Sequence, residues 1–438
     1  MLEIKINPTP NKALFFLVIL ILQSFTQKLA ISESISFLKI IDEVIVLFCI
    51  PFSIRVGLLL FKKNIVFKGF FLFLVIYWLF AITSSLFGGG TFVQALYQFV
   101  LDSKYIIIFL YCYGAYRENI SEKYLDKFFK FFVLINIPFV LLQLLTPDIY
   151  DTIFPLGAHH GSFFTASGDA FTRTAGILWF TGTLAFFSAL ASGFFLIKIW
   201  KLNASKENYL YLILSILLLL STLSRGEIAS FILAATLSYL FFISNKKIRH
   251  INLVFIFAVV TGITVSNASF IEKGLVEIGF NETAAGITLA PRAKMMSSAL
   301  SEANQNFPLG AGLGTLGGQA AVVYDSDLYY KHGFQYQWYF EQGLFLTDTY
   351  WPKIIAESGW LGALFLFFAY VYYPVKYLQH SSSVSFPGIF SFFSMTVLLI
   401  NSFSAPIYNS VITVFIVMFI CGFDNKNNLI ITRDNRID

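Results

Sequence analysis

The sequence predicts an all-α polytopic membrane protein, and its composition carries this prediction. Of its 438 residues, 57% are hydrophobic, 18% are aromatic and only 13% are charged. Soluble proteins carry about 25% charged residues. With a mean hydropathy of +0.72, the chain holds more apolar side chain than one or two globular cores can bury. Lipid must therefore cover much of the surface, which excludes a soluble enzyme.

Helices that cross a bilayer need roughly 17–25 predominantly apolar residues, and we expect about twelve of them here. The expected helices cover residues 12–31, 37–60, 66–87, 92–115, 127–146, 175–198, 208–224, 227–244, 251–268, 349–375, 386–404 and 406–422. If the N-terminus is cytoplasmic, most of the 30 Lys and Arg residues fall on the inner side, as the positive-inside rule requires. Both termini are therefore expected in the cytoplasm.

Two long segments, residues 147–174 and 269–348, then lie on the outer side. Loops of this length are usually functional or disordered, and the second is too rich in aromatic residues for a disordered segment. We expect three parts: helices with the first outer loop at 1–268, a folded outer loop domain at 269–348, and three helices with a cytoplasmic tail at 349–438.

Several other classes of site are not expected. Cys49, Cys112 and Cys421 each lie in an apolar run, which predicts neither a disulfide nor a structural metal. The apolar run after Lys12 has no signal-peptide cleavage site and is interpreted as the first transmembrane helix. The net charge of +5 is explained by orientation in the membrane, so no nucleic-acid partner is expected.

Three arginines, Arg173, Arg225 and Arg292, lie on the outer side or at its boundary, against the charge bias. Ionisable groups at such positions are candidate functional groups. A guanidinium fits phosphate oxygens bidentately, in charge-assisted bonds worth about 1.5–3 kcal/mol. Arg225 is the strongest candidate, because Ser-Arg-Gly-Glu at 224–227 interrupts a long apolar run. The arginines could bind a diphosphate, or each could reach lipid phosphate or a local carboxylate.

The second outer loop contains a glycine-rich segment at residues 308–317, with a formal GxGxxG pattern. No apolar strand leads into it and no strand–helix unit follows, so it is not a dinucleotide fingerprint. Gly310, Gly312 and Gly314 instead predict a tight backbone turn that approaches a ligand or a neighbouring helix closely.

Aromatic and polar side chains are interleaved after this turn, among them Tyr336 and Trp338. Aromatic faces beside polar groups suit sugars, although an interfacial aromatic belt would have a similar composition. His332 in this loop, with His159 and His160 in the first outer loop, can take up a proton near neutral pH. We treat these residues as candidates for substrate binding, and the histidine pair could equally be loop surface.

The chain re-enters the membrane after Asp348, and Glu357 follows inside the apolar part of the same predicted helix. Asp348 could act as a general base for a sugar hydroxyl or could cap the helix. Glu357 is expected to be a buried partner of a cation, and it is kept among the substrate-binding candidates.

The order of these features resembles the O-antigen polymerase and ligase family of bacterial inner membranes, whose members have a dozen or so helices and a large periplasmic loop late in the chain. The resemblance covers roughly residues 165–365. No single motif is specific, but five in order are. They are Arg173-Thr174-Ala175-Gly176, Ser224-Arg225-Gly226, Pro291-Arg292, Pro308-Leu309-Gly310-Ala311-Gly312-Leu313-Gly314, and Glu357-x-Gly359-x-x-Gly362.

The chain also departs from the family pattern. Where the family often has Pro-Asn after the first motif, this chain has Trp179-Phe180-Thr181. Ligases begin the re-entering helix with His-Asn, and this chain has Asp348-Thr349 there. The missing histidine favours the polymerase branch and leaves the identity of the base open.

The resemblance implies glycosyl transfer on the periplasmic face, without metal or cofactor, by a GT-C-like fold. The growing glycan would move from undecaprenyl diphosphate to a newly flipped, lipid-linked repeat unit. Arg225, Arg292 and Arg173 would neutralise the leaving diphosphate, and Asp348 would be the candidate base. Membrane lipid surrounds such an enzyme, and a flippase and a chain-length regulator are its implied protein partners.

Other functions compete with this one. A ligase, or a capsule or exopolysaccharide polymerase of the same family, would differ in its acceptor rather than in its fold. A lipid-linked sugar flippase or transporter needs access from both sides, and it usually lacks a large outer domain such as the one expected at 269–348. A third candidate is a structural or chain-length partner without catalysis.

Overall fold

The computed structural model describes residues 10–29, 34–63, 65–115, 122–154, 162–164, 170–202, 205–242, 291–337, 339–380 and 385–422. Within these ranges the regular secondary structure is helical apart from one short antiparallel hairpin, in which Phe163 pairs with Phe171. The elements are α1 (Pro10–Lys28), η1 (Ser36–Ile40), α3 (Ile41–Lys63), α4 (Ile65–Phe87), α5 (Phe92–Ala115), α6 (Glu122–Leu145), α7 (Pro147–Ile153), β1 (Ser162–Phe164), β2 (Ala170–Thr172), α8 (Thr181–Lys201), α9 (Lys206–Ser221), α10 (Arg225–Phe242), α13 (Pro291–Gln305), α14 (Gln319–Val323), α15 (Asp327–Lys331), η3 (Phe334–Tyr336), α16 (Trp351–His380), α17 (Phe386–Asn401), η4 (Ile407–Asn409) and α18 (Val411–Gly422).

Seven of the described helices, α3, α4, α5, α6, α8, α10 and α16, are long and apolar enough to cross a membrane, and α1, α17 and α18 are shorter apolar helices. Their outer faces are strongly apolar. Phe48 of α3 and Phe131 of α6, for example, are each 65% exposed, as suits side chains that face lipid. The structure therefore confirms a helical, polytopic membrane protein. The total of about twelve spans stays a prediction, because the expected helix at 251–268 lies outside the described residues.

The helices pack in pairs that are often distant in sequence. Helix α16 lies on α4, α8 on α9, α3 on α5 and α10 on α17. Lipid supplies no hydrophobic drive for helix association, so close packing and buried hydrogen bonds hold such pairs. Phe194 of α8 meets Phe390 of α17 edge to face at 5.3 Å, and Trp351 Nε1 of α16 donates to Ser402 Oγ at 2.9 Å.

One predicted helix begins later than expected. The stretch at 175–198 was predicted as helix, but α8 starts only at Thr181. Gly176 has φ +56°, a left-handed conformation that ends any regular helix, and Tyr150 Oη donates to its carbonyl at 2.7 Å. The N–H groups of Ala175 and Ile177 donate instead to the side chains of Gln143 and Asn136 on α6. Buried side chains of α6 thus satisfy this irregular backbone inside the protein.

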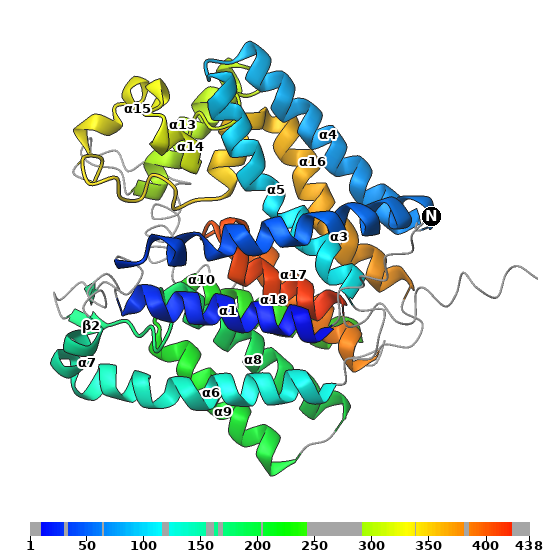
Figure 1. The fold of residues 1–438 in the computed structure, drawn as a ribbon, viewed down its shortest axis with the longest axis vertical. Helices are drawn as coiled ribbons and strands as arrows, with labels where there is room; N and C mark the ends of the chain where they lie inside the picture. The colour runs from blue at the N-terminus through cyan, green and yellow to red at the C-terminus, as the bar shows by residue number, and fades with distance from the viewer. Residues whose placement is uncertain are drawn as a thin grey trace, which may run out of the picture.

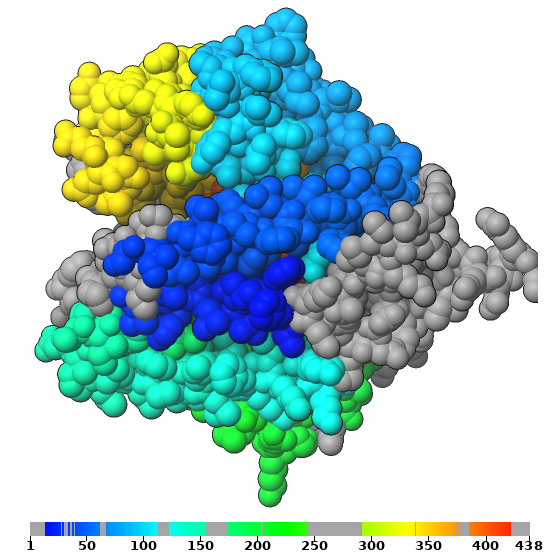
Figure 2. All heavy atoms as spheres, viewed as in Figure 1, coloured from blue at the N-terminus to red at the C-terminus, as the bar shows by residue number. Residues whose placement is uncertain are grey.

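Residues 291–348 form a compact unit, here called the loop subdomain, with a core of its own. Met295, Leu316, Tyr329, Phe334 and Tyr339 are its largest buried side chains. In Figure 1 it lies at the upper left, in yellow and yellow-green, and α7 and β2 of the other predicted outer loop lie at the same end of the helices. The space-filling view shows the loop subdomain packed against α4 and α5 (Figure 2).

The glycine-rich segment at 308–317, here called the glycine turn, lies directly on the backbone of α16. Ala311 N donates to Ala356 O at 2.8 Å, and Gly312 N donates to Glu357 O at 3.1 Å. Glu357 Oε1 also accepts from Gly314 N at 2.9 Å. These bonds hold the turn against the helix at the point where Gly359, with φ +72°, interrupts the helical backbone.

The same turn is held from its other side by α4 and α5. Ser84 and Ser85 accept hydrogen bonds from N–H groups of the turn at 2.9 and 2.8 Å, and Gln94 Nε2 donates to a turn carbonyl at 2.5 Å. The loop subdomain is thus fixed to three membrane helices through one backbone segment.

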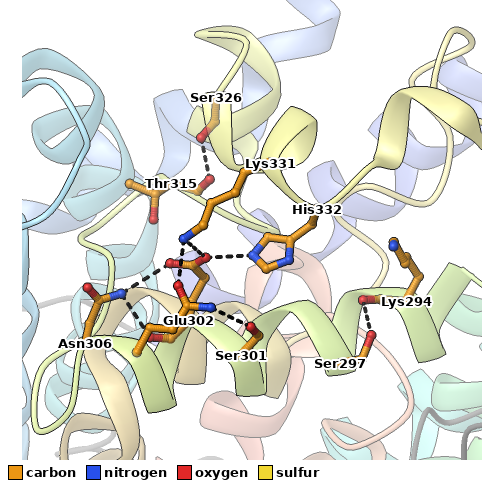
Figure 3. Close-up of polar contacts among 10 residues, drawn as sticks. Lys294, Ser297, Ser301, Glu302, Asn306, Thr315, Ser326, Lys331 and His332 are labelled. Carbon is orange, nitrogen blue, oxygen red and sulfur yellow. Dashed lines mark hydrogen bonds and ion pairs between the residues drawn. The ribbon is translucent and has the colours of Figure 1, made fainter.

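An ion-pair cluster closes the loop subdomain over α13 (Figure 3). Glu302, whose side chain is only 2% exposed, accepts from Lys331 Nζ at 2.5 Å and pairs with His332 Nε2 at 2.7 Å. Asn306 Nδ2 adds a bond to the same carboxylate at 3.2 Å. Burial raises the pKa of the Glu302 carboxyl, but Lys331 and His332 outweigh burial and hold that pKa below its ordinary value of 4.5.

Substituting Gly310 should destabilise the protein, because a Cβ there would lie 2.5 Å from the Glu357 carbonyl carbon and 2.5 Å from the Gly359 nitrogen. We expect Gly310→Ala to cost about 1–3 kcal/mol of unfolding free energy, as overpacking does, measured as a lower unfolding temperature in detergent. Gly89→Ala is the matched control, since nothing lies within 4 Å of its Cβ position. Equal stability of the two variants would show that the turn does not touch α16.

The cluster at Glu302 predicts a pH dependence of the loop subdomain. Because the folded state lowers the pKa of Glu302, its stabilising effect is complete above about pH 4.5 and is lost as pH falls through the lowered pKa. The protection of the α13 amides against hydrogen exchange, measured relative to the intrinsic exchange rate at each pH, should therefore fall on acidification. Glu302→Gln should flatten this dependence, whereas Glu341→Gln, which changes an exposed acid of the same subdomain, should keep the wild-type slope. A wild-type slope in Glu302→Gln would contradict the assignment.

Candidate active site

Arg173 lies in the irregular segment before α8 and is attached to the turn between α9 and α10. Its Nε donates to Thr222 O at 3.2 Å, and its Nη2 donates to Ser224 Oγ at 3.3 Å. Beside it, Thr174 N donates to Ser221 O at 3.3 Å. The guanidinium is half-buried and directed to the Ser-Arg-Gly turn rather than to open lipid.

The Ser-Arg-Gly turn is short and tightly packed. Helix α9 ends at Ser221 and α10 begins at Arg225, which is exposed. A Cβ at Gly226 would lie 2.3 Å from Ser404 Oγ, so the close approach of the residues after α17 requires glycine here. The motif therefore has a structural reason for its glycine and leaves its arginine accessible.

Glu227 is a buried carboxylate in this turn that the sequence analysis did not single out as a site residue. It is 5% exposed, and its Oε2 accepts from Ser224 Oγ at 2.5 Å while its Oε1 accepts from Asn401 Nδ2 at 3.3 Å. Ser224 thereby links Glu227 to Arg173. The sequence signal was present, because an acid directly after Ser-Arg-Gly in an apolar run must find partners inside the protein.

Arg292 and Asp348 form an ion pair where the loop subdomain meets α16. Arg292 is the second residue of α13, and Asp348 lies just before Trp351, the first residue of α16. The Nε and Nη2 atoms of Arg292 lie 2.8 and 2.7 Å from the same oxygen, Asp348 Oδ2. The side chains are 40% and 25% exposed, so both can be reached from solution.

The structure brings the three predicted arginines and Asp348 into one electrostatic neighbourhood. Burial lowers the pKa of the Arg173 guanidinium, the charges of Arg292 and Arg225 lower it further, and those of Glu227 and Asp348 raise it. An arginine keeps its charge under such shifts. Two guanidinium groups and two carboxylates thus act on Arg173, and the five side chains together carry a surplus of positive charge suited to an anion.

Glu357 is part of a buried polar network rather than of this exposed cluster. It is 1% exposed and bonds the glycine turn. One helical turn earlier, Lys353 Nζ donates to Asp102 Oδ1 of α5 at 2.6 Å, and the two side chains are 0% and 9% exposed. Gln98 Nε2 donates to the same Asp102 oxygen at 2.9 Å. The network connects α5, α16 and the glycine turn.

The α5 side of this network was not predicted from the sequence, although the sequence contains a signal for it. Gln94, Gln98 and Asp102 recur every fourth residue in a mostly apolar helix and so occupy one face. Asp102 also borders a cavity of about 20 Å³ that is lined by Tyr77, Tyr105 and other aromatic side chains. This volume is enough for one water molecule.

The remaining sequence candidates fall into two groups. His332 pairs with Glu302 inside the loop subdomain and not with any of the arginines, and Tyr336 is 81% exposed on the surface of that subdomain. His159, His160 and Trp338 lie outside the described residues. Within the described ranges, no group of three or more His, Cys, Asp or Glu side chains is arranged to hold a metal ion.

Comparison with known proteins identifies the segment that contains most of this site. No curated protein matches the chain. The family model described as O-antigen ligase matches residues 210–367, which run from within α9 to within α16. That range includes the Ser-Arg-Gly turn, Arg292, the glycine turn and Asp348, whereas Arg173 precedes it. Residues 210–367 of this polytopic membrane protein are thus similar to an O-antigen ligase family domain.

Proposed function

We propose that this protein is a polymerase of lipid-linked oligosaccharide repeat units of the O-antigen type. It transfers the growing glycan from undecaprenyl diphosphate to a new lipid-linked repeat unit at the periplasmic face of a bacterial inner membrane. The observation that supports this most is that Arg225, Arg292 and Asp348 all lie within electrostatic reach of Arg173, and that Arg292 contacts Asp348 directly. Members of the matching family transfer glycans from lipid-linked donors, which fits an arginine cluster beside membrane helices.

The arginine cluster supplies what departure of a diphosphate requires. When the glycosidic bond to phosphate breaks, the diphosphate keeps the bonding electrons and its negative charge grows. Positioned guanidinium groups stabilise that charge in the transition state. Arg225 is exposed and the Arg292 side chain is 40% exposed, so both can contact a donor. The half-buried Arg173 adds positive charge from a less accessible position.

Asp348 is the proposed base in the same step. The acceptor hydroxyl oxygen bonds to the anomeric carbon of the donor, the bond from that carbon to the diphosphate breaks, and the hydroxyl proton passes to Asp348. A single displacement of this kind inverts the anomeric carbon. In this proposal Tyr336, 81% exposed on the loop subdomain, offers a ring face to acceptor sugars.

A ligase is the second candidate, because the matching family model carries that description. It would pass finished glycan to a different acceptor by the same chemistry. Ligases have His-Asn where the chain re-enters the membrane. This chain has Asp348-Thr349 at that position, which favours the polymerase. Deleting the protein from its host separates the two: accumulation of single lipid-linked repeat units supports the polymerase, and accumulation of long lipid-linked polymer supports the ligase.

A flippase or transporter would not need the arginine cluster for bond breaking. Purified protein in vesicles with a defined lipid-linked repeat unit distinguishes these classes, because a polymerase lengthens the glycan whereas a flippase only moves it. Unlengthened glycan that crosses the vesicle membrane would contradict the proposal. A separate flippase and a chain-length regulator are the partners that the polymerase would need in the cell.

Removing one arginine tests the proposed active site. We expect Arg225→Ala to lower the rate of in vitro polymerisation by roughly 100-fold or more, as loss of one group that stabilises a transition-state anion does. Lys201→Ala is the matched control, because it removes an exposed cation at the opposite end of α8 and should leave the rate unchanged. Normal polymerisation by Arg225→Ala, with folded protein at wild-type level, would contradict the role of the cluster.

A further inference from the structure

The Arg292–Asp348 ion pair joins two side chains that the proposed reaction needs to be apart. Asp348 Oδ2 can accept a proton from an acceptor only after Arg292 releases it, and the Nε–Nη2 edge of Arg292 can bind a diphosphate only after Asp348 leaves it. In the structure that edge and that oxygen occupy each other, since Nε and Nη2 of Arg292 both contact Asp348 Oδ2.

We propose that this pair is an exchange site: the diphosphate of the lipid-linked donor displaces Asp348 from Arg292 and thereby releases the base. The inference rests on the proposed function, since it assigns the order in which the two partners of that reaction are engaged. Donor binding comes first, and only then is Asp348 available to take the proton of the acceptor hydroxyl.

The geometry of the pair supports direct competition. A guanidinium presents Nε and one Nη as a planar fork that a carboxylate or a phosphate can occupy. Asp348 takes both donors of that fork with one oxygen, at 2.8 and 2.7 Å. Arg173 differs, because its described bonds go to the neutral oxygens of Thr222 and Ser224, which an anion displaces without freeing a base.

The surroundings make the exchange favourable for a multiply charged anion. The two side chains are 40% and 25% exposed, and ion pairs that solvent reaches in this way are weak. A diphosphate carries more charge and more acceptor oxygens than one carboxylate. It is also attracted by Arg173 and Arg225, whose charges act in the same neighbourhood.

Exchange needs rotation of side chains rather than movement of the loop subdomain. Helix α13, which begins beside Arg292, packs along α16, and the glycine turn fixes the other end of α13 to α16 through Ala311 and Gly312. On the other side of the pair, Asp348 N donates to Phe345 O at 3.3 Å. Both residues thus stand on backbone that is held in place while their side chains separate.

The test compares binding and turnover in the full-length protein, with inorganic diphosphate as the probe. Asp348→Asn should bind diphosphate roughly five-fold more tightly than wild type, because Arg292 is no longer occupied, while polymerisation slows by about 100-fold or more through loss of the base. Affinity and rate therefore change in opposite directions. Asp348→Glu keeps the charge and should keep wild-type affinity.

Asp325→Asn is the matched control for charge. It removes one carboxylate from an exposed position of the same subdomain, where Asp325 accepts from Tyr330 Oη at 2.9 Å, and asparagine tolerates its positive φ of +47°. Diphosphate affinity and rate should both stay at wild-type values. An equal gain in affinity from Asp325→Asn would overturn the inference, because general electrostatics would then explain the result.

The failures of the two proposals are distinguishable. If wild type binds no diphosphate, the proposed diphosphate cluster is wrong. If wild type binds and Asp348→Asn binds no more tightly, or turns over normally, the cluster stands and the exchange is wrong. Should Asp348→Asn not fold, infrared difference spectra of wild type labelled with carboxyl-13C aspartate decide: saturating diphosphate should shift the stretching band of a carboxylate that leaves an arginine, and an unchanged aspartate band would overturn the inference.

Discussion

The glycine turn lies so close to α16 that their backbones hydrogen-bond to each other, and the position of the loop subdomain depends on this contact. Ala311 and Gly312 donate to carbonyls of α16, and Glu357 completes the contact by accepting from Gly314. Since α13 leads into the turn and α16 follows the loop subdomain, the contact also sets where α13 begins relative to α16. Arg292 and Asp348 meet for that reason. Two motifs that are far apart in the sequence are in this sense a single structural element.

The three arginines of the cluster come from three separate segments of the chain, and different contacts hold each segment in place. Arg173 is fixed through hydrogen bonds to the turn after α9. Arg225 is the first residue of α10 and precedes the closely packed Gly226, and Arg292 is the second residue of α13, the helix that the glycine turn anchors. Placing three cations together at a membrane boundary is costly unless carboxylates or a bound anion offset them. Glu227 and Asp348 provide a partial offset. The buried Glu227 supports Arg173 through Ser224, whereas the more exposed Asp348 holds Arg292 directly.

Composition and the lengths of apolar runs were enough to predict the class of the protein and, within a few residues, most of the described helices. The start of α8 could not be predicted in this way, because the apolar residues from Ala175 onward lie in irregular backbone that Gln143 and Asn136 of α6 satisfy. The arginines could be found because charge is conspicuous against the positive-inside pattern. Their pairing could not, since nothing local in the sequence places Asp348 against Arg292 rather than at a helix cap. The polar face of α5 can be recognised because polar residues recur every four positions. Its hydrogen-bond partners cannot, since they lie far away in the sequence, in the loop subdomain and α16.

The ion pair between Asp102 and Lys353 also has a consequence for how the protein is made. The two residues are 251 positions apart, and both side chains are buried between helices that cross the membrane. A ribosome delivers α5 to the membrane long before α16 exists, so α5 must wait in lipid or in the insertion machinery with an unneutralised carboxylate and a row of amides. The inserted state of α5 is therefore unfavourable until α16, in the last third of the chain, is synthesised and supplies Lys353. A chain truncated before α16 therefore keeps Asp102 without Lys353, and membrane quality control can recognise that unpaired carboxylate.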